Sequence, residues 1–140
     1  MAVTKNTIPR GIRNNNPLNI RVGNNWKGEV ANSTDKQFEQ FSTMVDGCRA
    51  GFKLLMKYIQ KYKLNTVELI INRWAPPSEN NTKRYIEMVC ENSGLRKNQI
   101  IDIKNADTMM KLFQAMAIVE NGRRISEIDI SMGYAYAMKS

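Results

Sequence analysis

The chain has 140 residues, of which 42% are hydrophobic and 24% charged. This length and composition are typical of one folded domain with a real core, and they exclude a disordered chain. Histidine is absent, which excludes histidine-based triads and histidine–metal sites. Two cysteines, Cys48 and Cys90, are too few for a cysteine-only zinc site or a disulfide scaffold. Carboxylates, hydroxyls and amides must carry any catalysis, and we expect no metal and no cofactor.

The charge of the chain favours a polyanionic partner. Lysine and arginine number 21 against 13 acidic residues, a formal charge of +8, which suits nucleic acid, an anionic membrane surface or bacterial wall polymer. The basic residues form no long run, zinc-finger or basic-zipper pattern, so we expect no specific nucleic-acid binding. No apolar run approaches the roughly 18 residues that span a membrane, and the N-terminus lacks the apolar core of a signal peptide. We therefore expect no membrane insertion.

Residues 11–47 are rich in turn formers, and the first element predicted there is a small β-hairpin. Leu18, Ile20 and Val22 alternate in a strand-like pattern, and the following residues 23–25 (Gly-Asn-Asn) tolerate the positive φ of a tight turn. A second strand around Trp26 would complete the hairpin.

Apolar periodicity, capping residues and helix stops predict five helices in the rest of the chain. They run from a cap at Asp46 to about Lys63, from Asn65 or Thr66 to Trp74, from Asn81 or Thr82 to Gly94, from Asn105 to about Glu120, and from Glu127 to Ala137. The pair Asn121-Gly122 is predicted to form the left-handed end of the fourth helix. The fold class is therefore mostly α (α+β), and residues 1–140 form a single domain.

The fourth helix carries an acid on its apolar face. Glu120 continues the apolar stripe formed by Met109, Leu112, Phe113, Met116 and Ala117. Desolvation and the negative end of the helix macrodipole would both raise the pKa of this carboxyl. A carboxyl that keeps its proton near neutral pH is what the general acid for a glycosidic bond requires. The alternative is that Glu120 turns to solvent or pairs with a nearby arginine.

Three segments resemble bacterial wall-lytic enzymes of the lysozyme-like superfamily. Residues 15–21 (NNPLNIR) and 25–29 (NWKGE) are similar to the Asn-Asn-Leu-Phe-Gly-Ile-Lys…Trp-x-Gly stretch of the glucosaminidase branch. Residues 78–89 resemble the Glu-Thr-Arg-x-Tyr-Val-x-x-Val segment of lytic transglycosylases, and residues 117–122 (AIVENG) resemble the helix end that bears the catalytic glutamate. More narrowly, residues 10–17 and 73–82 resemble phage virion-associated lysozyme-like structural proteins.

The resemblance implies a lysozyme-like fold in a changed chain order. In the wall-lytic families the glutamate helix precedes the Asn-rich segment, whereas here it lies near the C-terminus. We interpret this as a circular permutation, which is feasible because domain termini often lie close together. Glu120 and the segment Asn15–Asn19 would then be neighbours in space. Leu18 departs from the pattern, because the phage relatives commonly carry glycine there.

The resemblance also implies roles for particular side chains. Glu120 would be the general acid, and Tyr85 would point its hydroxyl into the cleft near it, with core packing as the alternative. Asn15, Asn16 and Asn19 would bind sugar hydroxyl or acetamido groups through their side-chain amides. The alternative is that these asparagines only hold turns. Trp26 is the expected stacking platform and Trp74 is expected in the core. Glu79 precedes a helix, and it suits substrate binding, a structural cap or a base.

The second carboxylate is left open. Glu29 is the first choice and Asp35 lies beside the same β element, while Glu39 is expected to face solvent. Without a second acid the substrate would supply the nucleophile, as in a lytic transglycosylase, so hydrolase and transglycosylase both stay possible.

These observations predict a phage-type glycosidase that cleaves the β-1,4 glycan of peptidoglycan. Its partners would be glycan strands and other virion proteins, and it would lie in the virion or in the host cytoplasm before release. The alternative is a non-catalytic lysozyme-like virion or wall-binding protein. A nucleic-acid binder is a third hypothesis, which rests on charge alone.

Overall fold

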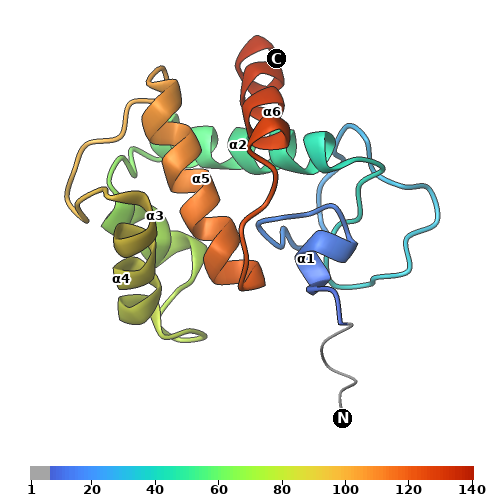
Figure 1. Cartoon of the computed structure of the whole chain (residues 1–140), viewed down its shortest axis with the longest axis horizontal. Helices are drawn as coiled ribbons and strands as arrows, with labels where there is room; N and C mark the ends of the chain where they lie inside the picture. The colour runs from blue at the N-terminus through green and yellow to red at the C-terminus, as the bar shows by residue number, and fades with distance from the viewer. Residues whose placement is uncertain (1–6) are drawn as a thin grey trace.

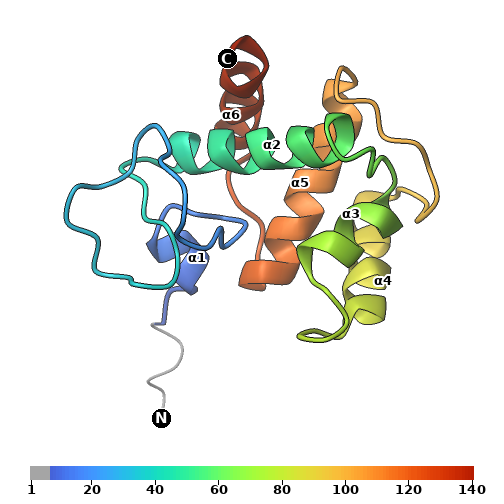
Figure 2. The same ribbon diagram turned by 180° about the vertical axis from the view of Figure 1, so that it is seen from behind.

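A computed structural model describes residues 7–140, and it is mostly helical. Six helices follow one another along the chain: α1 (Arg10–Arg13), α2 (Met44–Gln60), α3 (Val67–Trp74), α4 (Thr82–Ser93), α5 (Ala106–Asn121) and α6 (Glu127–Lys139). Figures 1 and 2 show α3 and α4 at one end of the molecule and α1 with its loops at the other, with α2 and α5 between them. The five long helices confirm the predicted ones; α1 is a short additional turn.

Side-chain caps set the starts of the helices. Thr43 begins α2, because its hydroxyl accepts a 3.1 Å bond from the amide of Asp46. The prediction that Asp46 itself is the cap was therefore wrong: it occupies the third helical position, where an acid is electrostatically favoured. At the two starts left open by the sequence, the caps are Thr66 and Asn81.

The end of α5 differs from the predicted cap pair. Gly122 alone adopts the left-handed conformation, with φ at 74°. Asn121 stays helical and is buried, with its side chain turned inward. This difference matters below, because Asn121 joins α5 to the N-terminal loops.

The core forms where α2 crosses α6 and where α5 packs against α4. The rings of Phe52 and Phe113 stack with centroids 4.2 Å apart. Glycines let the helices pack this closely. A Cβ on Gly51 would lie 2.7 Å from the Phe113 ring of α5, and a Cβ on Gly133 of α6 would collide with Cys48 of α2. The apolar stripe of α5 is fully buried, as its periodicity predicts.

The predicted hairpin of residues 18–26 is not formed. Within residues 7–140 the extended pairings are isolated bridges, and Arg21 pairs with Phe38 while Glu29 pairs with Phe41. The reason is local: Asn16 donates to the carbonyl of Ile20 and accepts from its amide. The stretch after Ile20 therefore pairs with residues 37–39 instead of folding back at Gly23 onto Trp26.

Asp35 ties the N-terminal loops together. Its carboxyl accepts from the Arg10 guanidinium at 2.6 and 2.8 Å, from the Asn14 amide at 2.9 Å, and from the backbone amides of Gln37 and Phe38. The bond from Arg10 is the largest reason that the pKa of Asp35 lies well below its usual range. Asp35 is therefore a structural anchor in this fold.

No helix of residues 7–140 is both long enough and apolar enough to cross a bilayer. Most of the N-terminal stretch that argued against a signal peptide lies outside the described residues.

Candidate active site

The carboxyl of Glu120 is held by two donors from distant parts of the chain. Glu120 lies at the C-terminal end of α5, where it is half-buried. The hydroxyl of Tyr85 in α4 donates to its Oε2 at 2.8 Å, and the side-chain amide of Asn19 donates to its Oε1 at 2.8 Å. Both contacts are between residues that the resemblance to wall-lytic enzymes singles out.

Tyr85 acts as a fixed donor. Its side chain is buried, and burial, followed by the neighbouring Glu120 carboxylate, raises the pKa of its hydroxyl well above the ordinary value. Because the phenol therefore stays protonated at neutral pH, it orients one oxygen of Glu120 and takes no proton itself.

A tight turn presents Asn19 to Glu120. Asn19 has a φ of +53°, a left-handed conformation that asparagine tolerates better than most residues. The backbone N–H of Asn19 donates to the backbone carbonyl of Asn16 at 3.0 Å. The turn is fastened to the helix end by Asn121, whose side chain donates to the carbonyls of Pro17 and Ala117 at 2.8 and 2.9 Å.

Glu120 opens onto a cavity of about 320 Å³ between the N-terminal loops and the segment after α3. Asn19 and Glu79 share this cavity with it, and Arg21 and Arg73 add positive charge. The lining mixes carboxylates, amides and guanidinium groups, which is the chemistry that binds hydroxylated and charged ligands.

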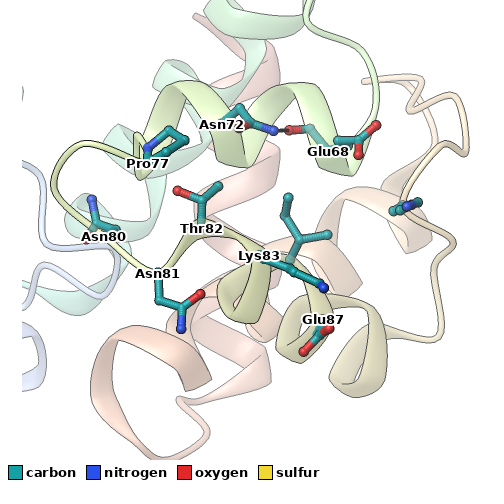
Figure 3. A pocket seen from close by; sticks show the side chains of 10 residues that line it. Glu68, Asn72, Pro77, Asn80, Asn81, Thr82, Lys83 and Glu87 are labelled. Carbon is teal, nitrogen blue, oxygen red and sulfur yellow. Dashed lines mark hydrogen bonds between the residues drawn. The ribbon is translucent and has the colours of Figure 1, made fainter.

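A second and larger cavity of about 570 Å³ adjoins the first, and Asn80 lines both. Figure 3 shows it between α3 and α4, with Glu68 and Asn72 on one wall and Lys83 and Glu87 on the other.

The structure brings together four of the eight predicted site residues: Glu120, Tyr85, Asn19 and Glu79. Asn15 and Asn16 instead hold the loop. Asn15 donates to the Phe41 carbonyl at 3.0 Å, and the buried Asn16 uses both ends of its amide on the backbone. They are therefore turn-holding residues, which was the alternative interpretation.

Both tryptophans are half-buried, and of the two Trp74 is the one that lines the Glu120 cavity. Trp74 also packs against both core clusters, as expected. Trp26, expected to be the sugar platform, packs partly buried against the small cluster of Ile20, Phe41 and Ala50. The reason is that Trp26 follows the loop that never forms the hairpin, whereas Trp74 ends α3 beside the cavity.

Glu29 and Glu39 form a carboxyl pair away from the cavity. Glu29 accepts from the backbone amide of Trp26 and lies beside Glu39. Glu39 is only 5% exposed, so the prediction that it faces solvent was wrong. Burial is the main cause that raises the pKa of Glu39 to about 7, and the Glu29 carboxyl adds to it. Neither residue lines the Glu120 cavity, so Glu29 is not placed to act with Glu120.

The polar residues at this site that were not predicted include Arg21, Arg73 and Asn121. Arg21 and Arg73 lie within the segments that resemble known families, so those segments are the signal that pointed to them. Asn121 was interpreted only as a helix end.

Within residues 7–140, no group of three or more acidic or cysteine side chains is arranged to hold a metal. Both cysteines are free thiols, and burial raises the pKa of Cys48. The thiol chemistry of the chain therefore lies outside the site.

No protein-family model matches the chain. The chain is 44% identical over 121 residues to Protein P5 of Pseudoalteromonas phage PM2, an alignment that covers 84% of this chain and 74% of that protein. With this identity over most of both proteins, the chain belongs to the family of that bacteriophage protein.

Proposed function

We propose that the protein is a glycosidase that cleaves the β-1,4 glycan of bacterial peptidoglycan, with Glu120 as general acid. The observation that carries the proposal is the carboxyl of Glu120, oriented by Tyr85 and Asn19 and facing a polar cavity. General acid catalysis needs a carboxyl within hydrogen-bonding reach of the glycosidic oxygen, and an oriented group loses less entropy on reaching it.

The geometry leaves room for the proton. Each carboxyl oxygen has two lone-pair positions, and each oxygen of Glu120 uses one of them for Asn19 or Tyr85. A proton on a remaining position can pass to the leaving oxygen while both donors stay in place. The same two donors then stabilise the carboxylate that results.

Glu79 is the second carboxylate that the cavity offers. In a hydrolase it would activate water or stabilise the positive charge that develops on the sugar. In a lytic transglycosylase the substrate's own hydroxyl attacks, and Glu79 would only bind. The two versions differ in their products, so product analysis decides between them.

We also propose that the fold is a circularly permuted lysozyme-like fold. Support comes from the 2.8 Å bond between Asn19 and Glu120, which are 101 residues apart in the sequence. The resemblance expects this juxtaposition of the Asn-rich segment and the glutamate helix.

The substrate is proposed to be a polymer. The Glu120 cavity and the larger cavity at α4 share Asn80 in their linings, and the chain carries a charge of +8. A long anionic glycan suits both features. We propose that the protein itself is found in a phage particle or in an infected host cell, because the relative of this chain is a phage protein.

One observation favours a second candidate, a non-catalytic phage structural or wall-binding protein. Both oxygens of Glu120 already accept hydrogen bonds inside the protein, as a purely structural carboxyl would. In that case the cavity would bind glycan without cleaving it.

The deciding experiment compares the wild type with Glu120→Gln on purified peptidoglycan. Released fragments are identified by mass spectrometry, which separates anhydro ends from reducing ends. Glu91→Gln, an exposed acid on α4, is the matched control. We expect cleavage by the wild type and the control and none by Glu120→Gln, with unchanged circular dichroism. Binding without cleavage by all three proteins would establish the second candidate instead, and cleavage by Glu120→Gln would remove Glu120 from the mechanism.

A further inference from the structure

Two arginines line the Glu120 cavity and carry charge that the protein does not neutralise. Arg21 comes from the N-terminal loops and Arg73 from the last turn of α3. None of the ion pairs found among residues 7–140 involves either of them. Their charge is thus available to a ligand.

Aromatic rings hold both guanidinium groups in position. Arg21 lies 5.1 Å from the centroid of the Phe38 ring, and Arg73 lies 4.8 Å from that of Tyr62. A guanidinium over a ring face keeps the N–H groups at its edge free for a planar acceptor. A ring contact restrains an exposed arginine side chain, so less entropy is lost when it binds a ligand.

Arg10, which lies over the same ring as Arg21, is an arginine with a structural role. It lies over the same Phe38 ring at 4.5 Å, but its N–H groups bind Asp35. Arg21 has the same ring and no acid. The contrast indicates that the free charge of Arg21 belongs to the cavity and is not needed by the loop.

From this we infer that the cavity selects a saccharide that carries a carboxylate substituent, bound by Arg21 and Arg73 while the sugar bond lies at Glu120. This inference rests on the proposed function and names the substrate class within it. The guanidinium fork matches the two oxygens of a carboxylate, and its positive charge attracts such a ligand. In peptidoglycan the carboxylates belong to the lactyl group or to the attached peptide.

The test measures binding directly, by titration calorimetry at low salt. The probes are peptide-free peptidoglycan strands, which carry lactyl carboxylates, and neutral N-acetylglucosamine oligomers of equal length. The variants are Arg21→Gln and Arg73→Gln. Arg96→Gln is the matched control, because Arg96 is exposed, lines neither cavity and carries the same charge.

We expect the wild type to prefer the carboxylate strands by roughly tenfold or more, since charge-assisted bonds are about twice as strong as neutral ones. Each cavity variant should lose most of that preference and keep its affinity for the neutral oligomer, whereas Arg96→Gln should change neither. Equal binding of both probes by the wild type, or an equal loss of both in the variants, would overturn the inference. So would an arginine-dependent preference for a glycerol-phosphate polymer over the carboxylate strands.

Each titration is repeated in the Glu120→Gln background, which is expected not to cleave the strands, so that the binding result is independent of turnover. Arginine-dependent binding without any cleavage supports this inference and contradicts the glycosidase, whereas cleavage without a carboxylate preference does the reverse. Circular dichroism of each variant verifies that it is folded.

Discussion

The hydroxyl of Tyr85 and the carboxyl of Glu120 are joined by a 2.8 Å hydrogen bond across 35 residues of chain. The bond connects α4 to the end of α5. It places a permanent donor on the carboxyl proposed to transfer the proton.

Tyr85→Phe tests this bond. The ring keeps its packing, but the Glu120 carboxyl loses one of its two donors and is less firmly oriented. We expect kcat for peptidoglycan cleavage to fall by roughly tenfold with little change in KM. Tyr134→Phe is the control, because it removes another buried hydroxyl bond, to the Ile103 carbonyl. An unchanged kcat in Tyr85→Phe would contradict the orienting role.

Asn121→Ala tests the fastening of the Asn19 turn. The change removes two bonds from a buried amide, to the carbonyls of Pro17 and Ala117. The Ala117 carbonyl keeps its helical backbone bond, but leaving the Pro17 carbonyl without a partner costs roughly 1–3 kcal/mol of unfolding free energy. Because Asn19 then loses its fixed position, cleavage should also fall. Urea denaturation and activity are measured together; full activity in a destabilised variant would show that the turn does not need this anchor.

The pair of Glu29 and Glu39 predicts a pH-dependent stability. The pKa of Glu39 is about 7 in the folded protein against an ordinary 4.5, so the folded state binds the proton more tightly. Its contribution to stability is complete below about pH 4.5 and is lost as the pH rises through about 7. We expect a loss on the order of 2 kcal/mol between pH 5 and pH 8.

Glu39→Gln should remove this loss, because the amide has no proton to release. Urea denaturation at several pH values compares it with the wild type and with Glu79→Gln, an exposed control acid. At pH 8 Glu39→Gln should be the most stable of the three. Parallel pH curves for Glu39→Gln and the wild type would show that Glu39 does not titrate in this range.

Gly133→Ala tests the crossing of α2 and α6. An added Cβ would collide with Cys48 and approach the backbone nitrogen of Arg49 to 2.9 Å. Backbone cannot yield as a flexible side chain does, so overpacking should cost about 1–3 kcal/mol. Ser131→Ala, an exposed position on the same helix, should stay within about 0.5 kcal/mol. Thermal denaturation measures both, and an unchanged melting temperature in Gly133→Ala would mean that the helices can separate freely.

The sequence by itself determined the five long helices and the acid at the end of α5. These depend on local chemistry: apolar periodicity, capping side chains and left-handed glycines act within one or two turns. The position of Glu120 on the apolar stripe of α5 followed from the same helical periodicity. The resemblance to known families then pointed to Asn19 and Tyr85 as its neighbours.

Only the tertiary structure decided which side chains enter the cavity. The place of Trp26 outside the cavity, the burial of Glu39 and the position of Arg21 all depend on how residues 14–43 pair with one another across loops that have no regular strands. A side chain in an irregular loop has no repeating period to fix its direction. Its direction is set by hydrogen bonds such as those of Asn16, Asp35 and Asn121, which exist only after the distant segments have met.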